Sequence, residues 1–162
     1  KEILFNDITN LNENFDTNRS GVETAVEFRF NEQVSLNANH TYAHATFDNG
    51  AFDDRAVPLT PRHRWAAGVE WKPAPSWTLA TRVVGVHDQW ALNDFNNLFP
   101  VEDYWTLSAR AAYRVGDWEF FVSGENLLGE EYASFVTSNA VDTVNFNPAP
   151  GNYMEFGVKW SV

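Results

Sequence analysis

The chain has 162 residues, of which 15% are aromatic, and it carries a formal net charge of −11 at pH 7. This charge argues against nucleic acid as a partner, because phosphate binding relies on clustered Lys and Arg. The chain has no cysteine, which excludes disulfide frameworks, thiolate metal sites and cysteine nucleophiles.

Alternation of apolar and polar residues, bounded by turn residues, predicts about eight β-strands. In chain order they cover residues 1–8, 19–30, 34–47, 62–72, 77–90, 104–115, 118–127 and 153–162. Most are longer than the ~5 to 6 residues typical of soluble strands, and they approach the ~9 to 11 that cross a bilayer at a tilt. No apolar run approaches the ~18 residues of a membrane helix, which excludes a helical membrane protein. Because the first predicted strand follows no start methionine or basic leader, we expect a longer polypeptide upstream.

The predicted connections alternate in length. Short ones cover residues 31–33, 73–76 and 116–117, and long ones cover residues 9–18, 48–61, 91–103 and 128–152. Short turns on one side and long loops on the other are typical of outer-membrane barrels, in which the short turns are periplasmic.

Several predicted strands have one apolar face and one face that carries charge. In the last strand Met154, Phe156 and Val158 alternate with Glu155 and Lys159. Because an unpaired ion in an apolar core is costly, we expect the charged face to line a polar lumen and the apolar face to contact lipid. Aromatic residues gather near the short turns, which predicts a girdle at the periplasmic membrane interface: Phe28, Phe30, Trp71, Trp77, Tyr113, Trp118, Phe120 and Trp160.

Five segments in order resemble the C-terminal portion of TonB-dependent outer-membrane receptors. They are NRSGVE (18–23), VPLTPRHRWAAGVEW (57–71), YWTLSARAAYRV (104–115), ENLLGEEY (125–132) and NPAPGNYMEFGVKWSV (147–162). The resemblance implies an all-β transmembrane antiparallel barrel of 22 strands in the bacterial outer membrane. Residues 1–162 would supply about eight C-terminal strands, without the N-terminal plug domain.

The same resemblance implies active import of a scarce nutrient, most often a ferric siderophore, with haem or cobalamin as other cargoes. Energy would come from the TonB protein through the N-terminal region, and outer-membrane lipid would surround the barrel. The barrel-assembly machinery would recognise a terminal pattern of Glu155, Gly157, Trp160 and Val162.

The sequence contains no pattern that indicates a catalytic site or a metal site. His40 and His44 would lie ~13 Å apart on a strand, too far to share one ion. The carboxylate pairs fall in predicted loops, where solvated surface charge is the default interpretation, and the nucleophile-elbow pattern GxSxG is absent. We therefore predict no enzyme activity, no metal site and no bound cofactor.

The candidate ligand-binding residues lie where a strand enters the third long loop. They are His87, Trp90, Asp94, Asn96, Asn97 and Phe99. Segment 132–147, rich in Asn and aromatic residues, is a second candidate, since binding residues often lie in loops on a rigid scaffold.

Two alternatives to a receptor fragment stay open at this point. One is a self-contained eight-stranded outer-membrane barrel that anchors or adheres without transport, for which pairing of residues 1–8 with 153–162 would be evidence. The other is a soluble barrel that binds an apolar molecule.

Overall fold

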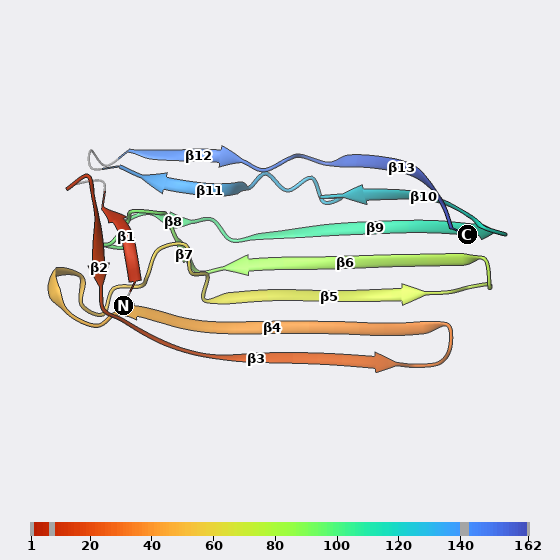
Figure 1. Ribbon diagram of the computed structural model, residues 1–162, viewed down its shortest axis with the longest axis horizontal. Coiled ribbons are helices and arrows are strands. Elements are labelled where there is room, and N and C mark those ends of the chain that lie inside the picture. The colour runs from red at the N-terminus through yellow and green to blue at the C-terminus, as the bar shows by residue number, and fades with distance from the viewer. Residues whose placement is uncertain (1, 7–8, 140–142, 162) are drawn as a thin grey trace.

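The computed structural model describes residues 2–6, 9–139 and 143–161, and its largest element is a seven-stranded antiparallel sheet (Figure 1). The strand order is β13-β10-β9-β6-β5-β4-β3. The bounds are β3 Thr17–Arg29, β4 Val34–Phe47, β5 His63–Trp71, β6 Trp77–His87, β9 Tyr104–Val115, β10 Trp118–Glu125 and β13 Tyr153–Trp160. The all-β antiparallel prediction is confirmed. Among the described residues, no helix has the length and hydropathy to span a membrane.

Short and long connections alternate as predicted, and they define the two ends of the sheet (Figure 1). The turns β3–β4, β5–β6 and β9–β10 lie at one end, here named the turn end, and the long connections lie at the other, the loop end. The Asn31 side chain accepts hydrogen bonds from the backbone N–H groups of Gln33 and Val34, both at 2.8 Å. Gly116 adopts φ 57° between β9 and β10, a conformation that glycine reaches without strain.

The register separates the two faces of this sheet. All Glu, Lys and Arg residues of the seven strands lie on one face, named the charged face. One cross-strand row on this face runs through every strand and alternates charge with small residues: Arg29, Ser35, Glu70, Ala80, Arg110, Ser123 and Glu155. Within these strands the opposite face, named the aromatic face, holds no Asp, Glu, Lys or Arg, as the alternation predicts.

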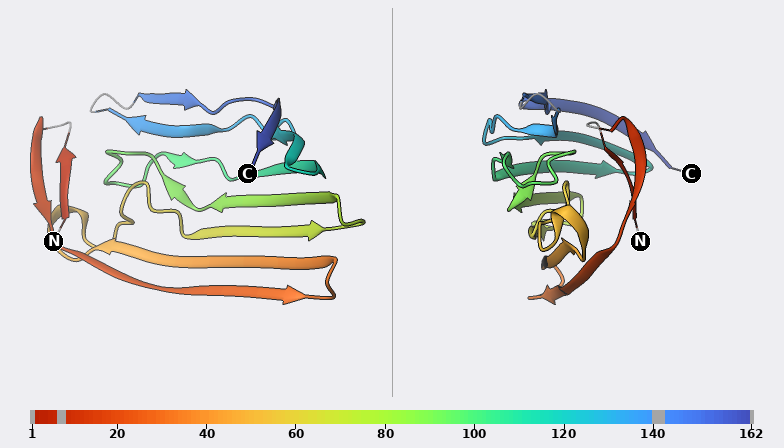
Figure 2. Two further views of the ribbon diagram at one scale, coloured as in Figure 1. Left: turned by 45° about the vertical axis from the view of Figure 1, so that its right-hand side comes forward. Right: turned by 90° about the vertical axis from the view of Figure 1, so that its left-hand side faces the viewer.

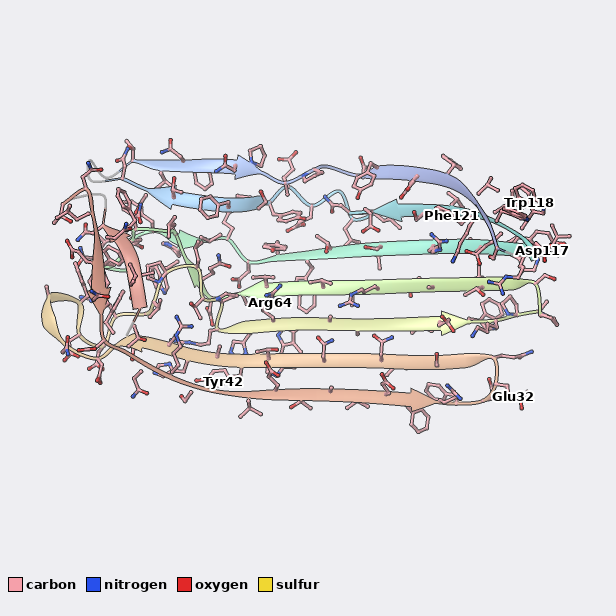
Figure 3. All side chains as sticks on the ribbon, in the orientation of Figure 1. Glu32, Tyr42, Arg64, Asp117, Trp118 and Phe121 are labelled. Atoms are coloured by element: carbon pink, nitrogen blue, oxygen red, sulfur yellow. The ribbon has the colours of Figure 1, made fainter. Side chains whose placement is uncertain are left out.

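The aromatic residues predicted near the short turns do lie at the turn end, and their side chains are exposed. Trp118 is paired with Trp160, with ring centroids 6.2 Å apart, and Trp77 contacts Tyr113 at 4.9 Å. Figure 3 shows Trp118 at this end beside Asp117, with Tyr42 and Arg64 nearer the loop end. Phe156, on the aromatic face of β13, is 75% exposed, so these rings do not form a compact centre.

Three hairpins at the loop end were not predicted. They are β1 Glu2–Asn6 with β2 Leu11–Phe15, β7 Gln89–Trp90 with β8 Pro100–Val101, and β11 Ala133–Ser138 with β12 Val144–Pro148. β11–β12 falls inside the predicted loop 128–152, and β2 falls inside the predicted loop 9–18.

Several predicted boundaries were wrong. The strand predicted over residues 1–8 does not join the main sheet, because Asn10 adopts φ 57° and turns the chain back so that β1 pairs with β2. β6 ends at His87 and β10 at Glu125, short of the predicted ends, because Asp88 and Asn126 both have positive φ, which ends an extended strand.

The seven-stranded sheet does not close on itself. Seen from the loop end it follows an arc, and its outermost strands are β3 and β13 (Figure 2). β1 pairs with β2, and the described part of the terminal segment, β13, pairs with β10. The pairing expected for a self-contained eight-stranded barrel is therefore not formed by the described residues, and the partial sheet is consistent with a fragment of a larger barrel.

The terminal pattern that the resemblance assigns to barrel assembly is only partly described. Glu155 and Gly157 lie on the charged face of β13 and Trp160 on the aromatic face, while Val162 lies outside the described residues. A Cβ at Gly157 would overlap the ring of Phe121, which pairs with it from β10. The guanidinium of Arg110 lies 3.8 Å from the centroid of the same ring. The position therefore needs glycine for packing, whatever its role in assembly.

We predict that Gly157→Ala destabilises the folded barrel by about 1 to 3 kcal/mol, because the added methyl overpacks against Phe121. The measurement is the thermal unfolding of the purified protein in detergent. Unfolding is monitored by the change in electrophoretic mobility on heating. Gly151→Ala is the matched control, since nothing lies within 4 Å of the position that its Cβ would take. Equal transition temperatures for the two variants would contradict the packing argument.

Candidate functional site

An aromatic cluster ties the loops together at the loop end. Ala45 and Phe47 at the end of β4 are buried with Val57 and Phe95 from two different long loops. Phe15 and Phe52 (in the short 3-10 helix η1, Gly50–Phe52) and Leu4 pack against them. Ring centroids of Phe15 and Phe95 lie 5.2 Å apart. Burying each of the phenylalanines Phe47 and Phe95 contributes about 1.5 to 3 kcal/mol, so this cluster helps to hold the connections 48–62 and 88–103 together.

Two of the predicted ligand-binding residues serve the loop's own structure. Asp94 is 4% exposed, and its carboxylate accepts hydrogen bonds from the backbone N–H groups of Leu98 at 2.9 Å and Phe99 at 2.7 Å. The Asn97 amide accepts from the Ala56 N–H at 2.7 Å and donates to the Ala56 carbonyl at 3.0 Å. Asn97 thereby joins the third long connection to the second.

The other predicted ligand-binding residues are spread over the loop end. Trp90 pairs with Pro100 in the β7–β8 hairpin, and the Phe99 carbonyl accepts from the Ala91 N–H at 3.1 Å. Asn96 is exposed between Phe95 and Asn97. His87 is the last residue of β6 and lies on the aromatic face, because it pairs with His63 in the register that places Trp65 there. The structure thus brings Trp90, Asp94, Asn97 and Phe99 into one loop region and places His87 on the wall of the sheet.

Two cavities lie among these loops. One, of about 160 Å³, is bounded by His44, Arg62, Asp88, Trp90 and Asp103, among others. The other has a volume of about 550 Å³. It lies between residues 101–103 and the segments where the chain enters β11 and leaves β12. Only the second falls in the ~300 to 1,000 Å³ range of small-molecule sites.

The larger cavity combines apolar walls with acidic side chains. Val136, Phe146 and Pro148 supply apolar surface, and the adjacent Tyr104 and Tyr132 rings stack at 4.2 Å. Four acidic residues also line the cavity: Glu102, Asp103, Glu130 and Glu131. Segment 132–147, the second candidate from the sequence, supplies Tyr132, Val136 and Phe146 to this cavity. The carboxylate pairs were interpreted from the sequence as surface charge, since nothing in the sequence shows that segments 102–103 and 130–131 meet.

No metal centre is formed by the part of the chain that the structure describes, where no group of three or more His, Cys, Asp or Glu side chains converges. His40 and His44 both face the same side of β4, two positions apart on that face. The separation expected from strand geometry therefore applies to them.

Comparison with known proteins places these features in a family. The sequence profile described as "TonB dependent receptor-like, beta-barrel" matches residues 2–127. The comparison with curated proteins finds no match.

Solved structures share the fold at low sequence identity. The ferric yersiniabactin uptake receptor FyuA of Yersinia pestis is 20% identical with a TM-score of 0.75, over 88% of this chain and 23% of that one. The siderophore receptor PiuA of Acinetobacter baumannii is 16% identical with a TM-score of 0.78, over 89% and 22%. The copper transporter OprC is 19% identical with a TM-score of 0.75, over 93% and 24%. The chain therefore spans about a quarter of the length of these proteins.

We predict that Asp94→Asn lowers the local stability of segment 91–103. The amide nitrogen of Asn is a donor, and it would face a backbone N–H group that needs an acceptor. Losing a buried hydrogen bond of this kind costs about 1 to 3 kcal/mol locally. Amide hydrogen exchange at Leu98 and Phe99 measures the effect. The exposed Asn96→Ala is the control, and unchanged protection at both amides in Asp94→Asn would refute the structural role.

Proposed function

Because the chain belongs to the TonB-dependent receptor β-barrel family, whose members lie in the outer membrane of Gram-negative bacteria, we propose that the full-length protein imports a small nutrient using energy delivered through TonB. The observation that carries this proposal is the separation of charge on the seven-stranded sheet. One face has every Asp, Glu, Lys and Arg of these strands, and the other is mostly apolar and aromatic with none of them.

The aromatic face has the dimensions of a membrane-spanning wall. In β5, Trp65 and Trp71 are six residues apart, or about 20 Å at the rise of an extended strand. Ala67 and Val69 occupy this face between them. Transmembrane barrels present an apolar band ~25 Å tall between two aromatic girdles. This supports lipid contact for the aromatic face.

The charged face is suited to a water-filled lumen. Glu119 lies 3.2 Å from the guanidinium of Arg110 and 3.1 Å from that of Arg114, so one carboxylate interacts with two cations. Such groups keep their charge only where water or partners replace lost solvation. A polar wall of this kind supports passage of a hydrophilic cargo through the barrel.

For the cargo we propose a ferric siderophore that is neutral or positively charged. Two structures similar to this chain are described as siderophore uptake receptors, which supports the class. The four carboxylates that line the cavity of about 550 Å³ would repel an anionic chelate, and the apolar and aromatic surface beside them suits an organic ligand.

We expect uptake of radioiron complexed by a cationic or neutral siderophore to require both this receptor and TonB. The assay compares cells that express the full-length receptor with cells that lack it, in backgrounds with and without TonB. Uptake that persists without TonB would reject active transport. Uptake that is TonB-dependent only for anionic chelates would retain the transport function and reject the proposed cargo charge.

The two faces can be tested by one substitution on each. Thr81→Arg on the aromatic face, midway between the turn end and loop end of β6, places a charge in the hydrocarbon and should cost about 2 to 4 kcal/mol. Thr106→Arg on the charged face of the neighbouring β9 should be nearly neutral. The measurement is the free energy of unfolding in lipid vesicles by urea titration. A larger cost for Thr106→Arg would show that the faces are reversed.

A further inference from the structure

All four histidines of the chain lie on the aromatic face at the loop end of the sheet. His40 is in a cross-strand row with Thr24, Trp65, Gly85 and Trp105. The next row toward the loops contains Val22, Tyr42, His63 and His87, and His44 follows one row further, paired with Ser20. The histidine belt, defined as His40, His44 and His63, is therefore a band along one edge of the surface proposed to contact lipid.

Neighbouring rings hold most of the belt in place. The His40 ring stacks on Trp65 with centroids 3.5 Å apart, and its Nε2 lies 3.0 Å from Nδ1 of His63. His87 contacts the Trp105 ring edge-on at 5.0 Å. Gly85 allows Trp105 to lie over the backbone, since a Cβ there would be 2.6 Å from the indole. The imidazoles are thus oriented by contacts on the wall itself.

Few other charges face the belt. Asp103 lies 3.1 Å from Nδ1 of His87 and also accepts a hydrogen bond from the Asp88 N–H. Nε2 of His87 is buried, so His87 has no nitrogen available to a lipid phosphate and is not part of the belt. Arg62 and Asp88 line the small cavity beside His44. Tyr42 lies between His40 and His44 on β4, and its ring contacts His63. β3 contributes Ser20, Val22 and Thr24, none of which is charged.

We propose that the histidine belt binds the phosphate groups of glycolipids in the outer leaflet, and that it binds them more tightly as pH falls. The inference rests on the proposed function, because it requires the aromatic face to meet lipid with the loop end outward. At the outer edge of the membrane a side chain on this face lies at the depth of the lipid phosphates. Imidazole in general gains a positive charge below neutral pH. The belt lies on a face whose strands hold no Asp, Glu, Lys or Arg.

Protonation changes what the His40–His63 pair can bind. When both rings are neutral, one nitrogen donates to the other across the 3.0 Å contact. When both rings are protonated, all four nitrogens are donors and this bond is lost. A phosphate oxygen then supplies the acceptor that each ring lacks and screens their repulsion. His44 is exposed and lies one row further toward the loops on the same face, paired with Ser20.

The test uses the full-length receptor in phosphatidylcholine vesicles, titrated with diphosphoryl lipid A or with dephosphorylated lipid A. Association is read from tryptophan fluorescence, for which Trp65 and Trp105 lie beside the belt. We expect the association constant for diphosphoryl lipid A to rise about fivefold per charged imidazole between about pH 7.5 and pH 5.5. The dephosphorylated lipid should show no such rise.

The triple variant His40→Gln, His44→Gln, His63→Gln should lose this pH dependence, because glutamine keeps a polar side chain and cannot become charged. Arg64→Gln is the matched control. It removes a cation at the same depth of β5 on the opposite face, and it should retain the dependence. A variant is folded if its electrophoretic mobility changes on heating in the same way as that of the unmodified protein.

Three results would overturn the proposal: pH dependence that survives in the triple variant, pH dependence lost in Arg64→Gln, or equal competition by free inorganic phosphate. The uptake assay separates this inference from the proposed function. Normal TonB-dependent uptake with no pH-dependent lipid association rejects the belt alone. Histidine-dependent association in a receptor that takes up cargo without TonB rejects the transport proposal alone.

Discussion

The structure depends on one constraint, the two-residue period of an extended chain, which forces neighbouring side chains onto opposite sides of a sheet. Hydrocarbon does not tolerate an unpaired ion, so a wall between lipid and water must place every charge on the same side. β3, with thirteen residues, keeps that separation along its whole length. The ion pairs of Glu119, the turn-end aromatic rings and the histidine belt all occupy positions that this period assigns to them.

The fold could be predicted from the sequence wherever its cause is local. The bounds of β4 and β9 were predicted to the residue, because turn residues lie on both sides of each strand. The β11–β12 hairpin was missed because its register shifts between Ala133 and Phe135, which breaks the alternation that identifies a strand. The turn from β1 to β2 includes a positive φ at Asn10, which an Asn between two short apolar segments does not by itself reveal.

The candidate site was less predictable, for a different physical reason. Asp94 and Asn97 have the side chains that a polar ligand would need, yet the same groups satisfy backbone atoms of their own loops. Residue type does not distinguish the two uses. Phe95 and Phe47 are separated by a whole hairpin and meet only because both long connections fold over the same end of the sheet. His87 was chosen for its place at a loop entrance, but the side it faces follows from its register with His63.

The charge separation also determines where the protein's electric field is strongest. The seven strands hold about as many Lys and Arg as Glu, so the net charge of −11 arises almost entirely from the connecting segments, which at the loop end are rich in Asp and Glu. Negative charge at the loop end attracts cations from the medium and accelerates their diffusional capture. Dissolved salt at 0.1 M screens this attraction at distances beyond about 10 Å. Capture of a cationic solute by this barrel would therefore slow steeply with ionic strength, even where the affinity of the site itself stays the same.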